Sequence, residues 1–178
     1  MIDIHELEIW YDEQYCLKAV KQNDYMIKFV KNQTEAICLA AVNQDGEALK
    51  FVKNQNEAIC LAAVKQEGCS LQYVKVQTEA ICLAAVNQNG EALKYVKVQT
   101  EDICLAAVKR NSYALRYVKD QTEAICLAAV NQDCGYALQF VNNQTEAICL
   151  AAVKQNDYTI NFVIREFWGI CFKELRKE

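Results

Sequence analysis

The chain has few of the residues that catalysis usually needs. Its 178 residues include one histidine, His5, and five glycines that do not cluster into a phosphate-binding loop. Its acidic residues recur at regular intervals and do not converge on one segment. Because acid–base and nucleophilic catalysis depend on convergent groups, we expect a protein that is not an enzyme and that needs no cofactor.

Long hydrophobic runs are also missing. The longest, such as residues 36–42, stop after seven residues, whereas a membrane-spanning helix needs about 20. The N-terminus carries acids where a secretory signal carries basic residues. We therefore expect an intracellular protein that does not enter a membrane. The mild net charge of -4 argues against a surface built as a whole to attract nucleic acid.

The chain does have ten cysteines and an apolar share of 53%, which is enough to bury a continuous core. Eight of the cysteines are 22 residues apart, except for one gap of 23 that is explained by an inserted residue near Cys134. These eight are Cys16, Cys38, Cys60, Cys82, Cys104, Cys126, Cys149 and Cys171. A fixed period of this length predicts a tandem array of structural repeats.

The period divides the chain into seven repeats between two terminal segments. Residues 1–11 fit the repeat poorly and are predicted to be an N-terminal cap, and residues 167–178 a capping half repeat. The repeats fill residues 12–166 and are 12–33, 34–55, 56–77, 78–99, 100–121, 122–144 and 145–166. Polar residues replace small ones near both ends, at Gln14 and Lys18 and again at Lys173 and Glu174, as a stack without further neighbours requires.

The first half of each repeat predicts an α-helix. In the repeat 34–55, Thr34 can cap the helix and Glu35 complements the positive end of its dipole. The apolar residues that follow suit a helix enclosed by its neighbours. Gly46 and its equivalents suit a helix end whose last residue turns left-handed, so we expect the chain to reverse there.

The second half of each repeat predicts a second, shorter helix. Leu49 and Val52 are three residues apart, as one face of a helix of roughly two turns requires. An alternating strand, which would give an α/β solenoid, is the alternative, but the leucine-rich repeat pattern is missing. The prediction is an all-α fold: an α-solenoid of short helix-turn-helix repeats of 22 residues with polar end caps.

Segments such as Glu-Ala-Ile-Cys-Leu-Ala-Ala-Val-Lys-Gln, followed by Tyr-Ala-Leu-Arg-Tyr-Val, resemble the repeat of domain-of-unknown-function family 4116. The resemblance spans about residues 12–166. This family is abundant in mimivirus-like giant viruses of amoebae, and no activity or catalytic residue is attached to its motif. The resemblance therefore implies a virus-encoded helical protein in an intracellular setting, and no reaction.

The cysteines suggest metal or disulfides at first sight. Equivalent atoms of stacked helical repeats lie roughly 10 Å apart, whereas a disulfide needs Cα atoms within about 7 Å and zinc binds sulfur at about 2.3 Å. We therefore predict no metal site, and we interpret the in-register cysteines as small, buried apolar residues. Cys69 and Cys134 lie outside the register, in turns, and are the expected exposed thiols.

Aromatic residues occupy one slot of the second helix, between Leu and Val, in every repeat. They could serve as a platform for stacking bases, but a slot that never turns polar favours core packing. These residues are Phe29, Phe51, Tyr73, Tyr95, Tyr117, Phe140 and Phe162. The tyrosines in the variable slot after the glycine position are better candidates for contact with a partner, and they are Tyr25, Tyr113, Tyr136 and Tyr158.

A basic row is predicted on the second helices, because its two positions are three residues apart and so share one face. Its members are Lys28, Lys31, Lys50, Lys53, Lys75, Lys94, Lys97, Arg116 and Lys119. The row is either a partner-binding surface or a solvated face neutralised by a neighbouring acidic row. The acidic row is Glu35, Glu57, Glu79, Glu101, Glu123 and Glu146.

These features predict a non-catalytic repeat scaffold that mediates protein–protein interaction through the basic row and the turn tyrosines. One alternative is a nucleic-acid-binding solenoid that uses the basic row. Another is a structural protein that self-assembles.

Overall fold

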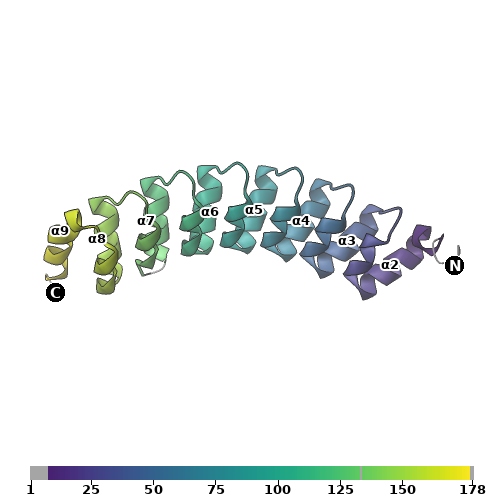
Figure 1. The fold of residues 1–178 in the computed structure, drawn as a ribbon, viewed down its shortest axis with the longest axis horizontal. Coiled ribbons are helices and arrows are strands. Elements are labelled where there is room, and N and C mark those ends of the chain that lie inside the picture. Colours follow the sequence, from purple (N-terminus) through teal and green to yellow (C-terminus); the bar gives the residue numbers. More distant parts are fainter. Residues whose placement is uncertain (1–7, 133, 177–178) are drawn as a thin grey trace. The chain divides into compact units, whose positions relative to one another are not determined.

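The computed structural model describes residues 8–132 and 134–176, and every regular element within them is a helix. The α-helices are α2 (Glu13–Gln22), α3 (Glu35–Gln44), α4 (Glu57–Gln66), α5 (Glu79–Gln88), α6 (Glu101–Arg110), α7 (Glu123–Gln132), α8 (Glu146–Gln155) and α9 (Arg165–Leu175). The prediction of an all-α repeat fold is confirmed (Figure 1).

A short 3-10 helix follows each of α2 to α8, and another precedes α2. These helices are η1 (Ile9–Tyr11), η2 (Asp24–Lys28), η3 (Gly46–Phe51), η4 (Gly68–Tyr73), η5 (Gly90–Tyr95), η6 (Ser112–Tyr117), η7 (Tyr136–Phe140) and η8 (Asp157–Phe162).

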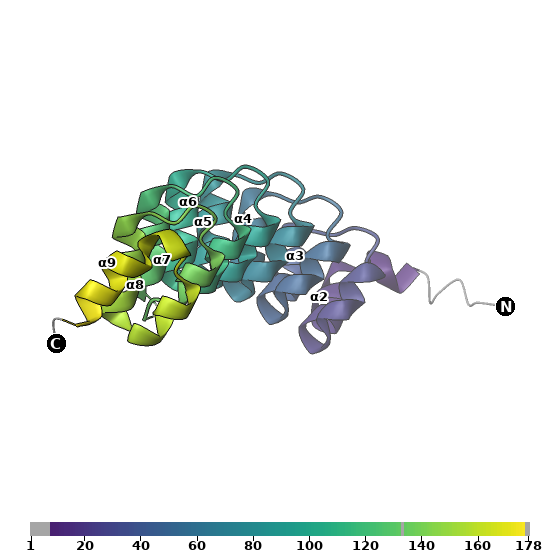
Figure 2. The same cartoon turned by 60° about the vertical axis from the view of Figure 1, so that its left-hand side comes forward.

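The chain forms two compact units, Met1–Gln88 and Asn89–Glu178, here called unit 1 and unit 2. The boundary lies between α5 and η5, inside the predicted repeat 78–99. Within each unit, consecutive α-helices pack against one another in chain order. Each of η2 to η4 in unit 1, and each of η6 to η8 in unit 2, packs against the α-helix before it and the α-helix after it (Figure 2).

The second helix of each repeat is a 3-10 helix, as its sequence period explains. Between α3 and η3 the extended residue Asp45 accepts a hydrogen bond from the backbone N–H of Glu47 at 2.8 Å. Gly46, Leu49 and Val52 are all buried at a spacing of three residues. A helix with three residues per turn aligns these positions in one row, and such helices rarely exceed a few residues.

The glycine slot mostly serves close packing, so the predicted left-handed helix end is wrong for most repeats. Among the described residues, only Gly135 (φ 83°) and Cys134 (φ 46°) have positive φ, next to the inserted residue. A Cβ on Gly46 would lie 2.5 Å from the carbonyl oxygen of Ala63, and one on Gly90 would lie 2.5 Å from that of Ala107. Glycine is present because the next α-helix approaches too closely for a side chain.

The core of each unit contains the in-register cysteines. All eight are at most 4% exposed, which confirms that they are small buried residues. None of the ten cysteines, all of which lie in the described residues, forms a disulfide; Cys69 is partly exposed and Cys134 is exposed, as expected for turn positions.

Both terminal segments pack on the neighbouring repeat. The backbone N–H of Lys31 donates to the carbonyl of Trp10 at 3.1 Å, and the Trp10 ring lies 5.5 Å from that of Phe29. His5 falls outside the described residues. At the other end α9 begins at Arg165, two residues before the predicted boundary, and exposes about two-fifths of Trp168 and Phe172. In the described part of the chain, no helix has both the length and the apolar character for crossing a membrane.

Candidate functional site

A row of half-buried glutamines, here called the glutamine ladder, ties neighbouring repeats together. The Nε2 atom of Gln121 donates to the carbonyls of Leu115 at 3.2 Å and Phe140 at 2.9 Å, and its Oε1 accepts from the backbone N–H of Asn142 at 2.9 Å. The thiol of Cys126 also donates to Oε1, at 3.7 Å. Equivalent bonds to the next repeat are made by Gln33, Gln55, Gln99 and Gln144.

Sequence reasoning missed this ladder, although a signal was present. Glutamine stands at the same place in the first six of the seven repeats, directly before the helix cap, and this recurrence at a polar, half-buried slot has a structural cause.

The predicted basic row divides into two sets with different surroundings. Lys28, Lys50, Lys94 and Arg116 lie on 3-10 helices, whereas Lys31, Lys53, Lys75, Lys97 and Lys119 lie in the loops that follow. The Nζ of Lys53 donates to the carbonyls of Val30 and Lys31 at 3.0 and 3.1 Å. The Nζ atoms of Lys75 and Lys119 likewise donate to the carbonyls of the equivalent lysines one repeat earlier, at 2.6 and 3.2 Å. Three lysines of the loop set therefore also tie repeats together.

The predicted acidic row also makes contacts between repeats. Thr78 donates to Glu57 at 3.2 Å, and Thr145 donates to Glu123 at 2.8 Å. On the 3-10 helices, Lys50 pairs instead with Glu47 at 3.2 Å, which raises the pKa of Lys50, and Arg116 pairs with Glu91 at 2.9 Å. The acidic partners Glu47 and Glu91 each directly follow the glycine position of their repeat, so they do not belong to the predicted acidic row.

The aromatic slot is half-exposed, and the prediction that it belongs to the core is wrong. Phe51, Tyr73, Tyr117 and Phe140 are all of intermediate exposure, and Phe29 is 43% exposed. The slot is one residue before the buried valine and two after the buried leucine. With three residues per turn, it therefore lies between the buried and the solvent-facing rows.

Cations lie over several of these rings. In unit 1 the Nζ of Lys28 is 3.7 Å from the centre of the Tyr25 ring, and that of Lys50 is 5.2 Å from the Phe51 ring. Hydrogen bonding to Lys28, together with its positive charge, lowers the pKa of Tyr25. In unit 2, Arg116 is 4.8 Å from the Tyr117 ring.

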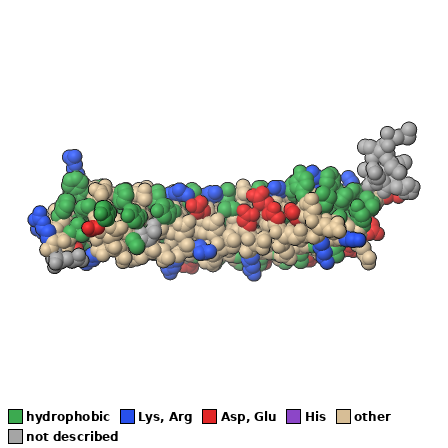
Figure 3. Space-filling view, turned by 90° about the horizontal axis from the view of Figure 1, so that it is seen from below, with side chains coloured by type: hydrophobic (Ala, Val, Ile, Leu, Met, Phe, Trp, Pro, Cys, Tyr) green, Lys and Arg blue, Asp and Glu red, His purple; other side chains and the backbone are tan. Residues whose placement is uncertain are grey.

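Unit 2 carries a surface of aromatic pairs that we call the tyrosine patch, made of Tyr113, Phe140, Tyr136, Phe162 and Tyr158. Each pair joins neighbouring repeats: Tyr113 and Phe140 have ring centres 5.5 Å apart, and Tyr136 and Phe162 have centres 6.3 Å apart, both edge-to-face. Tyr113, Tyr136 and Tyr158 remain 40%, 38% and 71% exposed. A view from below shows hydrophobic side chains gathered over the C-terminal part of the chain and also over its N-terminal part (Figure 3).

Two positions beside these rings are uncharged. Gln139 and Asn161 occupy the positions where earlier repeats carry lysine or arginine, and their amides donate to the carbonyls of Tyr136 at 3.1 Å and Tyr158 at 3.0 Å. Within the described residues the side chains of the three tyrosines form no hydrogen bond, and each residue is partly exposed.

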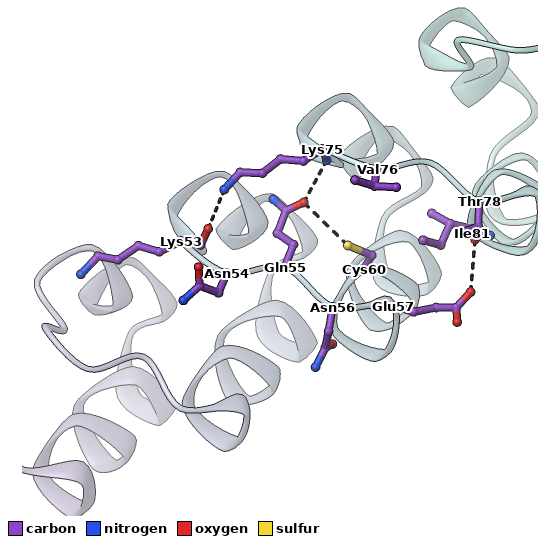
Figure 4. A pocket seen from close by; sticks show the side chains of 10 residues that line it. All are labelled: Lys53, Asn54, Gln55, Asn56, Glu57, Cys60, Lys75, Val76, Thr78 and Ile81. Atoms are coloured by element: carbon purple, nitrogen blue, oxygen red, sulfur yellow. Dashed lines mark hydrogen bonds between the residues drawn. The ribbon is translucent and has the colours of Figure 1, made fainter.

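A groove of about 490 Å³ lies in unit 1 between two successive loops (Figure 4). The buried Cys60 and Ile81 line it together with exposed loop residues. Its polar atoms mostly bind one another: Lys75 bonds to Lys53 and Gln55, and Thr78 to Glu57. The groove therefore consists mainly of contacts that hold the repeats together.

Nucleophilic chemistry is not favoured at the buried cysteines of the repeats. Burial, followed by a smaller contribution from a nearby carboxylate, raises the pKa of the thiols of Cys38, Cys60, Cys104 and Cys126, so they are protonated near neutral pH. Among the described residues, no cluster of three or more His, Cys, Asp or Glu side chains could hold a metal ion.

Comparison with known families gives one match. Residues 78–122, which contain the predicted repeats 78–99 and 100–121, match the model of a domain of unknown function, DUF4116. Neither the curated proteins nor the solved structures include a match to the chain. The family resemblance expected from the sequence is thus supported over residues 78–122.

Proposed function

We propose that the chain is a non-catalytic scaffold that binds another protein through the tyrosine patch of unit 2. The observation that carries this proposal is the partial exposure of Tyr113, Tyr136 and Tyr158 on short helices fixed by packing on both sides. Tyrosine is enriched in protein interfaces, because a rigid ring with a polar end supplies contact area at a low cost in conformational entropy.

The other side chains that recur in the repeats are weaker candidates for a binding surface. The glutamines, the loop lysines and the threonine–glutamate pairs are occupied in contacts between repeats, and the buried thiols are not activated. The turn tyrosines of unit 2, although two of them pack on a ring of the next repeat, keep between 38% and 71% of their surface exposed. We expect Arg116 and Lys94 to contribute to partner choice, because charges at the rim of an interface steer association.

The proposal extends to location. The family resemblance implies a virus-encoded protein, and the scaffold would then act inside the infected cell on a viral or host partner.

Affinity purification with the tagged full-length chain tests this proposal. The wild-type chain is compared with the double variant Tyr113→Ala/Tyr136→Ala, and with Tyr11→Ala, which removes an exposed tyrosine outside the patch. A captured protein is then purified, and its binding is measured by calorimetry. We expect the double variant to lose at least tenfold in affinity and Tyr11→Ala to bind like wild type. Equal affinities for all three chains would refute the proposal.

Nucleic-acid binding is a second candidate, favoured by the cations that lie over aromatic rings in unit 1. Lys28 and Lys50 combine a positive charge with a ring face, which is the chemistry that single strands require. Salt-dependent retention on heparin that is lost in Lys28→Glu/Lys50→Glu would support this function. No retention at low salt would eliminate it.

Self-association is a third candidate, favoured by the half-exposed Trp168 and Phe172 of α9. Light scattering that shows a monomer at all concentrations would count against it.

A further inference from the structure

The tyrosine patch has a regular spacing that limits what can bind it. Its tyrosines come from three successive repeats, and packed helices lie about 8–10 Å apart. A bound segment must therefore present equivalent side chains at about this interval to contact every tyrosine.

A polyproline II helix meets this condition. It rises about 3.1 Å per residue with three residues per turn, so every third residue returns to the same face after about 9 Å. The side chains on one face of a β-strand lie about 6.6 Å apart, which does not fit. An α-helix meets the spacing through residues seven apart, at about 10.5 Å.

Hydrogen bonding separates the two conformations that fit. The hydroxyls of Tyr113, Tyr136 and Tyr158 form no hydrogen bond within the described residues. A polyproline II segment has no internal hydrogen bonds, so its carbonyls can accept from these hydroxyls, whereas the carbonyls of an α-helix are already bonded. Aromatic rings in a row are also the surface against which proline-rich segments dock.

The charge of the patch is uneven, which gives the segment a preferred chemistry. The 3-10 helices η5 and η6 and the loops after them carry Lys94, Lys97, Arg116 and Lys119 against Glu91 and Asp120, an excess of two positive charges. At the other end of the patch Gln139 and Asn161 are neutral, and the exposed Asp157 beside Tyr158 adds a negative charge. A partner with acidic residues at one end and uncharged residues along the rest complements this distribution.

We propose that unit 2 binds a proline-rich segment in the polyproline II conformation, with proline at every third position and acidic residues at one end. The prolines lie against Tyr113, Tyr136 and Tyr158, and the acidic end lies beside Arg116 and Lys94. This inference rests on the proposed function and names the chemistry of the partner.

Synthetic peptides test the inference with the full-length chain. The probe is a fluorescent peptide of about twelve residues, with proline at every third position and two aspartates at one end. It is made with the aspartates first and with the aspartates last, because a polyproline II helix can bind in either direction. Matched peptides have proline at every fourth position, or two lysines in place of the aspartates. Binding is measured by fluorescence anisotropy.

We expect one of the two acidic peptides to bind, and both the fourth-position and the lysine peptides to bind at least fivefold more weakly. Tyr136→Ala should weaken binding at least tenfold and Tyr136→Phe about threefold, because the second keeps the ring and loses the hydroxyl. Arg116→Glu should weaken binding of the acidic peptide and should not weaken binding of the lysine peptide. Tyr25→Ala, which changes the same slot in unit 1, should bind like wild type. Circular dichroism confirms that each variant is folded.

Several results would overturn the inference. These are no binding by either acidic peptide, equal binding of the third- and fourth-position peptides, and preferential binding of a helical peptide with leucine at every seventh position. Binding of an oligouridylate that depends on Tyr136 would instead identify the patch as a nucleic-acid site. If the peptides fail while a captured protein still depends on Tyr113 and Tyr136, the proposed function survives and only the partner chemistry is wrong.

Discussion

Gly90 and Gly169 occupy opposite environments. A Cβ on Gly90 would lie 2.5 Å from the carbonyl oxygen of Ala107 and 2.9 Å from the Cβ of Asn111, whereas a Cβ on Gly169 in α9 would meet nothing within 4 Å. The first clash involves backbone, which cannot move aside as a flexible side chain can.

We therefore expect Gly90→Ala to lower the free energy of unfolding by about 1–3 kcal/mol through overpacking. Gly169→Ala is the matched control, and it should raise the free energy of unfolding by up to about 1 kcal/mol because alanine favours a helix. Urea denaturation followed by circular dichroism measures both. A loss of stability of the same size in both variants would show that the close approach at Gly90 is not the cause.

The buried thiols predict how stability depends on pH. Burial, with a smaller contribution from Cys171, raises the pKa of Cys149 to about 11 from the ordinary value of 9.0. Above pH 9 this thiol ionises in the unfolded chain but stays protonated in the folded one. Its contribution to stability is therefore complete below about pH 9 and is lost as the pH rises toward about 11.

We expect the melting temperature of the wild-type chain to fall more between about pH 8 and about pH 10.5 than that of Cys149→Ala. Tyrosine and lysine titrate in both chains, so the difference between the two curves isolates the thiol. Parallel curves would mean that Cys149 ionises equally in the folded and unfolded chains.

The elements of each unit are joined by side chains that bind main-chain groups of the next repeat. Gln121 contacts η6, η7 and the loop after η7 at once. The threonine–glutamate pairs join the starts of successive α-helices through side chains alone, since the threonine hydroxyl donates to the glutamate carboxylate. The spacing between elements is thus fixed by hydrogen bonds as well as by apolar packing.

Removal of one ladder side chain tests this view. Gln121→Ala removes the bonds to the carbonyl of Phe140 and the N–H of Asn142, while the carbonyl of Leu115 keeps its bond from Val118. The change should cost about 1–3 kcal/mol of unfolding free energy. Gln72→Ala, at an exposed position on η4, should change it by less than about 0.5 kcal/mol. The urea midpoints of both variants decide the question. If the urea midpoint of Gln121→Ala is as close to the wild-type midpoint as that of Gln72→Ala, the glutamine ladder does not contribute to stability.

The sequence predicted the elements better than their exact geometry. The helix that begins after Thr34, and the second helix expected from the three-residue spacing of Leu49 and Val52, are both present. The predicted capping bond of Thr34 is wrong, because its hydroxyl accepts no hydrogen bond from the backbone of α3 and donates instead to Glu13 at 2.8 Å. A segment of six residues fits an α-helix and a 3-10 helix equally well, so the type of the second helix could not be predicted. The outward position of Phe51 follows from that type, since hydrophobicity alone places an aromatic ring inside.

The candidate site was predictable in part. Tyr113, Tyr136 and Tyr158 were identified as contact residues because their slot varies between repeats, and the structure places all three at the surface. Their pairing with Phe140 and Phe162 was not predictable, because each pair joins residues from different repeats. The division of the basic row into a helical set and a loop set was not predictable either. It depends on the residue at which each 3-10 helix ends, as η3 ends before Lys53, and residue spacing does not determine that end.

At the scale of each unit, the described helices of a repeat pack against those of the repeats next to it in the chain, so local stability depends on position. In unit 1, α3 and α4 each pack between two other α-helices, as α7 does in unit 2. By contrast, α9 packs against α8 and η8 alone, and α2 has one neighbouring α-helix, α3. A chain of this kind has the stability of a sum over nearest-neighbour contacts.

Hydrogen exchange should reveal this gradient. We expect backbone amides of α2 and α9 to exchange at least tenfold faster than those of α3, α4 and α7, because the terminal helices can open without disturbing two interfaces. Mass spectrometry of peptic fragments measures the rates at the level of single helices. Uniform protection along the chain would mean that it opens as one cooperative block.

The glutamine ladder has a consequence for how such a chain changes over generations. Each glutamine binds carbonyls of the main chain, which every repeat offers whatever its side chains are. A duplicated or transplanted repeat therefore arrives with its bonds to both neighbours already specified, and no compensating mutation is needed elsewhere. Length can then vary by unequal recombination, while the turn residues of each copy remain free to diverge toward a different partner.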